Sequence, residues 1–166
     1  DSSPKQAKYL TIDFARYLRK NIDSLNSEEL IPFEQEMDHV ACYLKIEKAR
    51  FRERLNVIYS VQCKEFAIPP LTIQPIVENA IKHGLMRLES GGTVLIRSYE
   101  TDSHFCVEVK DDGVGFDTSL PIEGKKHVGL RNIQGRLKAM VNGDLILESK
   151  PGVGTKAVIM IPKEVT

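Results

Sequence analysis

The chain has 166 residues, of which 42% are hydrophobic and 28% charged, as in one ordinary soluble domain with a short extension. Lys plus Arg and Asp plus Glu number 23 each, so the balanced charge gives no bulk attraction to nucleic acid or to an anionic membrane. No apolar run approaches the roughly 20 residues of a membrane helix, no signal peptide opens the chain, and the 3 cysteines form no C-x-x-C pair.

The N-terminal region is predicted to be a helix over residues 5–21, followed by a short polar connector over residues 25–31. The chain starts at Asp1 without an initiator Met, so we expect it to be a piece of a longer protein. Apolar residues at steps of three and four form a seam for another helix. This seam consists of Ala7, Leu10, Phe14 and Tyr17. We expect it to pair with a neighbouring chain or with the domain's own surface.

A second, longer helix is predicted to begin at Pro32, because proline suits a first helical turn. Its apolar stripe is Met37, Val40, Leu44, Phe51 and Leu55. The charged residues beside the stripe are interpreted as a solvated face. They are Glu34, Glu36, Glu47, Lys48, Arg50, Arg52, Glu53 and Arg54.

From Asn56 the apolar pattern changes to a period of two, which predicts a strand. A helix follows Pro69–Pro70, with Pro75 disturbing its first turns and Gly84 ending it after His83. The remaining predicted elements are strands over 93–100 and 105–110, a long loop over 111–128, a helix over 130–140 ending near Asn142, and strands over 145–149 and 156–161. The sum is an α+β unit of about five strands and three helices.

Four short motifs carry the chemistry. The first is Glu-Asn-Ala-Ile-Lys-His-Gly at residues 78–84, in which helical spacing places Asn79, Lys82 and His83 on one face. A neutral amide oxygen suits a divalent metal and a lysine suits phosphate. On its own, this motif is better explained by a polar helix end with His83 and Gly84 as a C-terminal cap.

The other three motifs also have ordinary structural explanations when taken singly. Residues 111–116, Asp-Asp-Gly-Val-Gly-Phe, place a carboxylate at a strand end, where it can accept a hydrogen bond from an exocyclic amine, or they form a tight acidic turn. Residues 127–132 begin a helix whose free N–H groups suit phosphate, or they are a plain glycine-led helix start. Residues 152–155, Gly-Val-Gly-Thr, lie between two strands and also fit a hairpin turn.

The order of the four motifs is more specific than any of them alone. Over residues 34–163 the chain resembles the ATPase superfamily shared by gyrase, the ninety-kilodalton heat-shock chaperone, histidine kinases and MutL proteins. This resemblance implies the Bergerat fold, a two-layer α/β sandwich with a mixed sheet and three helices on one face. The segments 15–19, 33–36, 43–51 and 68–79 further resemble LytS-like sensor histidine kinases.

The resemblance implies two parts and a set of residue roles. Residues 1–25 would be the second helix of a dimerising, histidine-bearing hairpin, and residues 26–166 the ATP-binding catalytic domain. Asn79 would ligate Mg²⁺ on the ATP phosphates, Lys82 would contact a terminal phosphate, and Asp111 would bind the adenine amino group. The other implied nucleotide contacts are His83, Gly113, Gly115, Phe116, Lys125, Lys126, Gly129, Leu130 and Thr155, and Glu78 would assist in an undefined role.

Two departures from the superfamily pattern bear on the activity. Pro75 stands one helical turn before Asn79, where the gyrase-like ATPases carry a water-activating Glu, so we expect phosphoryl transfer to protein and not ATP hydrolysis. None of the four histidines lies in the Asn-Pro-His-Phe context of the family's phospho-acceptor. We therefore expect the chain to bind ATP without phosphorylating itself.

The leading hypothesis is a two-component protein-histidine kinase that passes phosphate to a response-regulator aspartate. It would dimerise in its full-length form and reach the membrane only through segments upstream of a cytoplasmic domain. Two alternatives stay open: a degenerate nucleotide-binding or dimerisation module without transferase activity, and an ATPase that hydrolyses nucleotide.

Overall fold

The computed structural model describes residues 29–118 and 128–163, together with isolated residues between positions 8 and 22. These isolated residues are all helical, in agreement with the helix predicted over 5–21; they are Lys8, Thr11, Ile12, Phe14, Ala15, Leu18, Arg19 and Ile22. Phe14 of the predicted seam is 49% exposed. Ala7, Leu10 and Tyr17 lie outside the described residues, as does the boundary at 25/26, so the pairing of the seam and the division into two parts stay predictions.

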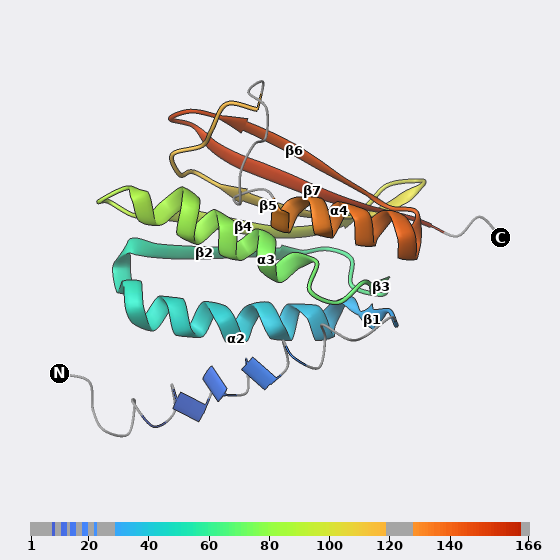
Figure 1. The fold of residues 1–166 in the computed structure, drawn as a ribbon, viewed down its shortest axis with the longest axis horizontal. Helices are drawn as coiled ribbons and strands as arrows, with labels where there is room; N and C mark the ends of the chain where they lie inside the picture. The colour runs from blue at the N-terminus through green and yellow to red at the C-terminus, as the bar shows by residue number, and fades with distance from the viewer. Residues whose placement is uncertain are drawn as a thin grey trace.

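A five-stranded mixed sheet forms one layer, with strand order β2-β4-β5-β7-β6 (Figure 1). β2 runs parallel to β4, and the remaining neighbours are antiparallel. The strands are β2 (Leu55–Val61), β4 (Gly92–Glu100), β5 (His104–Asp111), β6 (Asp144–Lys150) and β7 (Gly154–Pro162). The strands predicted from alternation are all present. A further two-residue pairing of β1 (Ile31–Pro32) with β3 (Ala67–Ile68) was not predicted.

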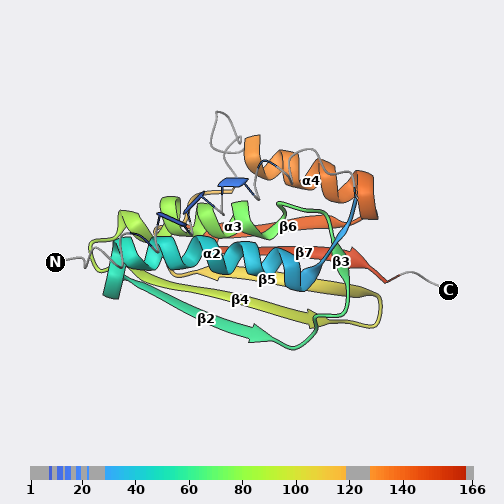
Figure 2. The same cartoon turned by 90° about the horizontal axis from the view of Figure 1, so that it is seen from below.

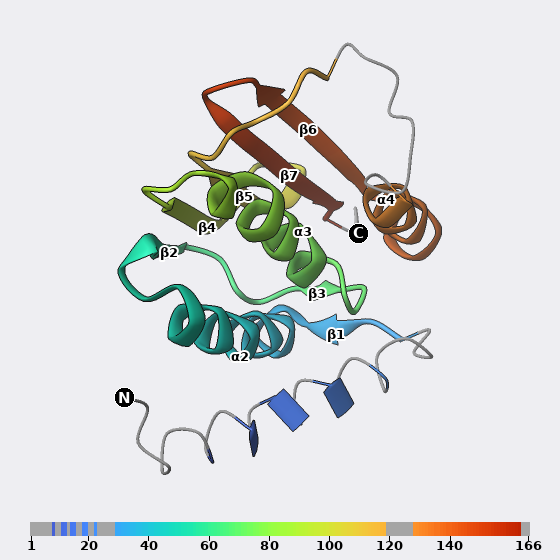
Figure 3. The same ribbon diagram turned by 60° about the vertical axis from the view of Figure 1, so that its left-hand side comes forward.

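Three helices cover one face of the sheet, as Figure 2 shows from below: α2 (Phe33–Phe51), α3 (Ile73–Asn79) and α4 (Val128–Val141). A 3-10 turn, Arg52–Arg54, joins α2 to β2. Figure 3 shows α3 between α2 and α4, and it contacts both. Alternate strand residues such as Val94, Ile96 and Val107 point into this interface and are at most 1% exposed. The predicted two-layer α/β sandwich is confirmed.

The charged face predicted for α2 is only partly solvated. Glu36 is 0% exposed and Glu47 is 7% exposed, so the prediction that both face water is wrong. A buried carboxylate is tolerated where hydrogen-bond donors surround it, and for Glu36 these donors are the backbone of a different helix. The remaining charged residues of that face are exposed, as expected.

Gly84 does not end its helix, so that prediction is also wrong. After α3 the chain continues through a π-helical turn, Ala80–Gly84, and a 3-10 turn, Leu85–Arg87. Gly84 has φ −91° and ψ −76°, which is not the left-handed conformation of a glycine cap. The 3-10 turn after Gly84 places Leu85 in the core, where it is 0% exposed.

α4 ends at Val141, and Asn142 follows it with φ 49°. This agrees with the helix end predicted near Asn142. Among the helices that the structure describes, none combines the length and the apolar character needed to cross a bilayer.

Candidate functional site: a cavity between α3 and the sheet

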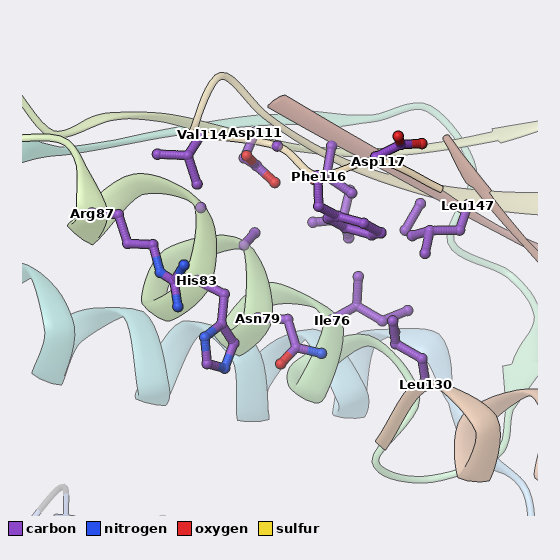
Figure 4. Close-up of a pocket in the computed structure, with 16 residues that line it drawn as sticks. Ile76, Asn79, His83, Arg87, Asp111, Val114, Phe116, Asp117, Leu130 and Leu147 are labelled. Carbon is purple, nitrogen blue, oxygen red and sulfur yellow. The ribbon is translucent and has the colours of Figure 1, made fainter. Parts of the chain in front are cut away.

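A cavity of about 290 Å³ lies between α3, the end of β5 and the start of α4 (Figure 4). Its volume is at the lower limit of the usual range for small-molecule sites. The side chains around it are mainly apolar, with a few polar groups that converge on the space. The lining residues are Ile76, Asn79, Ala80, His83, Gly84, Arg87, Val109, Asp111, Val114, Gly115, Phe116, Asp117, Leu130, Leu147, Thr155 and Ala157.

Asn79 and Asp111 line this same cavity, although 32 positions separate them in the sequence. Asn79 is the last residue of α3, and Asp111 is the last residue of β5. Because α3 packs across the end of β5, an amide and a carboxylate meet across one space. Had the two side chains lain on opposite surfaces, the nucleotide interpretation of the motifs would have failed.

The α3 wall of the cavity extends further than the sequence indicates. Asn79 and His83 are four positions apart and both line the cavity. Arg87 lines it too, four positions beyond His83, and Figure 4 shows all three side chains along the same wall. Arg87 was missed because the helix was expected to stop at Gly84; continued helical spacing from Asn79 through His83 would have found it.

The carboxyl group of Asp111 is 4% exposed and accepts a hydrogen bond of 2.9 Å from the backbone N–H of Gly113. Burial raises the pKa of Asp111 to about 6, although hydrogen bonds from the backbone of Gly113 and Thr155 lower it. The charge of neighbouring Asp112 adds a smaller upward shift of the pKa. Asp111 is therefore ionised at neutral pH and ready to accept a hydrogen bond from a ligand.

The turn after Asp111 depends on two glycines. Gly115 has φ +58°, and a β-carbon there would lie 2.1 Å from the carbonyl oxygen of Lys150. Gly113 packs directly on the α3 segment, since a β-carbon on it would lie 2.4 Å from the carbonyl carbon of Gly84. Gly113 does not itself line the cavity. It allows the turn to approach α3 closely enough for Asp111 to face Asn79.

Ser149 on β6 joins the turn to the Gly-x-Gly-Thr hairpin, a link that the motifs did not reveal. The backbone N–H of Phe116 donates to the Ser149 hydroxyl oxygen at 2.9 Å. The same hydroxyl lies 2.9 Å from that of Thr155 and donates to the carbonyl of Gly154 at 3.0 Å. Phe116 and Thr155 are thus held on one side of the cavity, opposite α3.

Several candidate residues do not line the cavity. The carboxylate of Glu78 accepts hydrogen bonds from Gln74 at 3.0 Å and from Lys82 at 3.2 Å. Lys82 also lies 5.9 Å from the ring centre of Tyr43 on α2. Gly129 in the first turn of α4 is exposed, whereas its neighbour Leu130 lines the cavity. Lys125 and Lys126 lie outside the described residues.

The donor set suits a metal carried by a ligand better than a metal held by the protein alone. Within residues 29–118 and 128–163, no three His, Cys, Asp or Glu side chains cluster as a metal site. The amide oxygen of Asn79 is a hard ligand of the type that Mg²⁺ uses alongside phosphate oxygens. An oxygen ligand at this position is compatible with a divalent ion that is also bound by a ligand's phosphate groups.

Solved structures share this architecture. The histidine kinase domain of the blue-light activated kinase of Erythrobacter litoralis EL346 aligns with TM-score 0.59 at 21% identity, covering 88% of this chain and 74% of that domain. The mycobacterial sensor histidine kinase MprB aligns with TM-score 0.61 at 17% identity, covering 82% and 97% respectively. At such low identity these matches establish the shared fold alone.

Sequence comparisons assign the family. Residues 71–165 match the model of the histidine kinase-, DNA gyrase B- and HSP90-like ATPases, and residues 1–55 match a histidine kinase model. The chain belongs to this ATPase family, as the ATP-binding domain of a sensor histidine kinase.

Curated relatives of the chain are considerably longer than it is. The uncharacterised protein YwpD of Bacillus subtilis is 34% identical, over 95% of this chain and 59% of its own length. The sensor histidine kinase YpdA of Escherichia coli is 35% identical, over 99% of this chain and 30% of its own length. The sensor protein LytS of Oceanobacillus iheyensis is 33% identical, over 84% of this chain and 26% of its own length. The chain therefore corresponds to only part of each relative.

Proposed function

We propose that this chain binds Mg-ATP in the α3–β5 cavity and transfers the γ-phosphoryl group to a histidine on another segment of its parent kinase. The single observation that carries the proposal is the shared cavity of Asp111 and Asn79. A buried carboxylate at one end and an amide oxygen at the other match the two ends of a purine nucleotide.

The residues have distinct roles in this proposal. Asp111 accepts a hydrogen bond from the adenine amino group, while Gly115, Phe116 and Thr155 shape the base pocket. Asn79 provides an oxygen ligand to Mg²⁺, which supplies charge neutralisation for the phosphates. The remaining proposed phosphate-side contacts are Lys82, His83, Lys126, Gly129 and Leu130. Lys82 and Gly129 have to move from their positions outside the cavity lining, or act from its rim, to take part.

Transfer to protein is favoured over hydrolysis by the composition of α3. Pro75 occupies the position one turn before Asn79 and has no group that can activate water. The nearest carboxylate on the helix, Glu78, is engaged by Gln74 and Lys82 and lies outside the cavity lining. Phosphoryl transfer itself needs alignment and charge neutralisation more than it needs a base.

The proposal extends to the whole protein. The parent kinase would dimerise through a helical hairpin of which residues 1–25 form one helix, and it would pass phosphate to an aspartate on a response-regulator receiver domain. The names of the relatives, which include sensor histidine kinases, support this role. The chain would then be the cytoplasmic part of a kinase anchored in the inner membrane by other segments.

Calorimetric titration of the 166-residue chain with ATP and Mg²⁺ tests the site. We expect Asp111→Ala and Asn79→Ala each to weaken binding by about tenfold or more, which is about 1.4 kcal/mol. The matched control is Asp102→Ala, an exposed carboxylate in the β4–β5 turn at the opposite end of β5, and it should bind as the wild type does. Unchanged affinity in both site variants would refute the assignment.

Phosphorylation of the full-length protein tests the activity. With labelled ATP, label should enter the full-length protein and be lost when its upstream histidine is replaced. Nucleotide binding without any phosphoryl transfer would instead support a non-catalytic nucleotide-binding module. Steady release of free phosphate by the chain alone would support an ATPase.

A further inference from the structure

The buried carboxylate of Glu36 on α2 is bonded to the start of α3. Its Oε1 accepts hydrogen bonds from the backbone N–H groups of Thr72 at 2.9 Å, Ile73 at 3.0 Å and Gln74 at 3.3 Å. Its Oε2 accepts a fourth, from Leu71, at 3.1 Å. Glu36 is 0% exposed, so all four bonds form away from water. Burial raises the pKa of Glu36 above its usual 4.5, while the four backbone N–H donors act against that rise.

The local sequence does not supply this cap. The first N–H groups of a helix have no partner within it and usually receive one from a Ser, Thr, Asp or Asn at the N-cap. Thr72 occupies that position, but its hydroxyl donates to the carbonyl of Pro69 at 2.6 Å, and no side chain of the N-cap residue bonds the helix. The cap comes instead from a residue 35 to 38 positions earlier in the chain.

The segment that Glu36 holds is unusual in its backbone. Leu71 has φ +55°, a left-handed conformation that a residue with a β-carbon adopts only when its surroundings enforce it. The N–H of Leu71 is one of the four donors to Glu36. From the other side, the Arg136 side chain on α4 donates to the carbonyl of Pro70. The entry to α3 is therefore fixed jointly by α2 and α4.

The contact also joins two regions of the chain that match different family models. Glu36 lies in the region matched by the histidine kinase model, residues 1–55, whereas α3 lies in the ATPase match, residues 71–165. α3 and the turn after it contribute Ile76, Asn79, Ala80 and His83 to the cavity. A displacement of the helix start would therefore move the cavity wall that carries Asn79.

We propose that Glu36 is a positioning residue for the nucleotide site: by capping α3 from α2, it fixes the Asn79 amide relative to Asp111 on the sheet. This inference rests on the proposed function, because it assigns Asn79 to the metal–phosphate end of the nucleotide.

The test compares two ligands that use different ends of the cavity. Titrations of the 166-residue chain would use adenosine, which needs the Asp111 end, and ATP with Mg²⁺, which needs both ends. Glu36→Gln replaces one acceptor oxygen by an NH2 group that cannot accept from the backbone N–H groups. We expect Mg-ATP to bind about fivefold more weakly to this variant, while adenosine binding changes by less than about twofold. The matched control is Glu34→Gln on the same helix, whose exposed side chain pairs with Lys64, and both of its affinities should be those of the wild type.

Two outcomes overturn the inference. One is a folded Glu36→Gln chain with wild-type Mg-ATP affinity, and the other is an equal loss for adenosine and Mg-ATP, which would indicate general damage. If Glu36→Gln does not fold by circular dichroism, Glu36→Asp is measured, because its carboxylate is one methylene too short to reach all four donors. It should show the same selective loss, and unchanged affinities overturn the inference. If the wild-type chain binds no ATP, the proposed function fails together with this inference. If the wild-type chain binds ATP and only the Glu36 variants behave unexpectedly, the inference alone fails.

Discussion

Gly84 and Asp111 are in direct contact at the base of the cavity, and the contact leaves no room for a side chain on Gly84. A β-carbon built there would lie 2.6 Å from Oδ1 of Asp111 and 3.0 Å from its carboxyl carbon. The backbone is also joined nearby, since the N–H of Val114 donates to the carbonyl of Gly84 at 3.3 Å. Glycine is required at position 84 because the helix and the acidic turn meet there, and not because the helix ends.

Gly84→Ala should therefore damage the site more than it damages the fold. The added methyl group has to displace the Asp111 carboxyl group, so we expect ATP affinity to fall by about tenfold or more. Overpacking of this kind should also lower the free energy of unfolding by about 1–3 kcal/mol. Titration calorimetry and urea denaturation would measure the two effects.

Gly135→Ala is the matched control for that substitution. Gly135 lies within α4, and a β-carbon there would meet nothing within 4 Å. Alanine is the better helix former by about 1 kcal/mol, so this variant should be at least as stable as the wild type and should bind ATP normally. Equal behaviour of the two alanine variants would show that the Gly84–Asp111 contact does not matter for the site.

Adenosine binding should depend on pH through Asp111. The pKa of this carboxyl group is raised to about 6, so it is ionised above that pH and protonated below it. Only the ionised form is a full acceptor for the amino group, and affinity should fall as the pH is lowered through about 6, whereas an ordinary aspartate would keep its charge down to about 4. Adenosine is the suitable probe because it has no phosphate that titrates in this range. A flat profile between about pH 8 and pH 5 would contradict the assignment.

Asp111→Asn should stabilise the ligand-free chain while it weakens nucleotide binding. The pKa of Asp111 is higher in the folded chain, at about 6, than its ordinary value of 3.8. The protonated carboxyl group therefore stabilises the fold fully below pH 3.8, and this stabilisation is lost as the pH rises through about 6. Above pH 7 the buried negative charge lowers the free energy of unfolding. Removing it should raise the free energy of unfolding by about 1–2 kcal/mol, below the full equivalent of the shift because the open cavity admits water. Thermal melts at about pH 7.5 would test this, and a lower melting temperature for the variant would contradict it.

Ser149→Ala should weaken nucleotide binding without removing any group that contacts the nucleotide in the proposal. It leaves the N–H of Phe116 without its 2.9 Å acceptor and the hydroxyl of Thr155 without its neighbour on β6. The loss of about one partly buried hydrogen bond should reduce ATP affinity by about threefold to tenfold as this side of the pocket loosens. Ser103→Ala, in the β4–β5 turn, is the control, and an unchanged Ser149→Ala chain would show that the link has no role in binding.

The sequence predicts this cavity well because each motif is local and marks the end of an element. Asp111 ends an alternating strand, and Asn79 and His83 follow helical spacing. The resemblance of the ordered motifs to the ATPase superfamily then implies that these elements meet at one pocket. The Glu36 cap could not be predicted in the same way. A charge at a helical position gives no sign that its partners are backbone groups 35 or more residues away. Gly84 was misjudged for a related reason, because its partner Asp111 is distant in the sequence.

The 166-residue chain should bind ATP and incorporate no phosphate from it. Three of its histidines have definite places: His39 is buried, His83 lines the cavity, and His104 lies 2.7 Å from the Ser103 hydroxyl in the β4–β5 turn. His39 is 4% exposed and does not line the cavity, and His104 lies at the end of β5 opposite Asp111. In the proposal, His83 lies on the phosphate side of the cavity, where it contacts the bound nucleotide but does not receive its phosphoryl group. Incubation with γ-labelled ATP and Mg²⁺, followed by gel analysis under conditions that preserve phosphohistidine, checks the prediction. Stoichiometric label that disappears in His83→Gln or His127→Gln would refute it and place the acceptor within the chain.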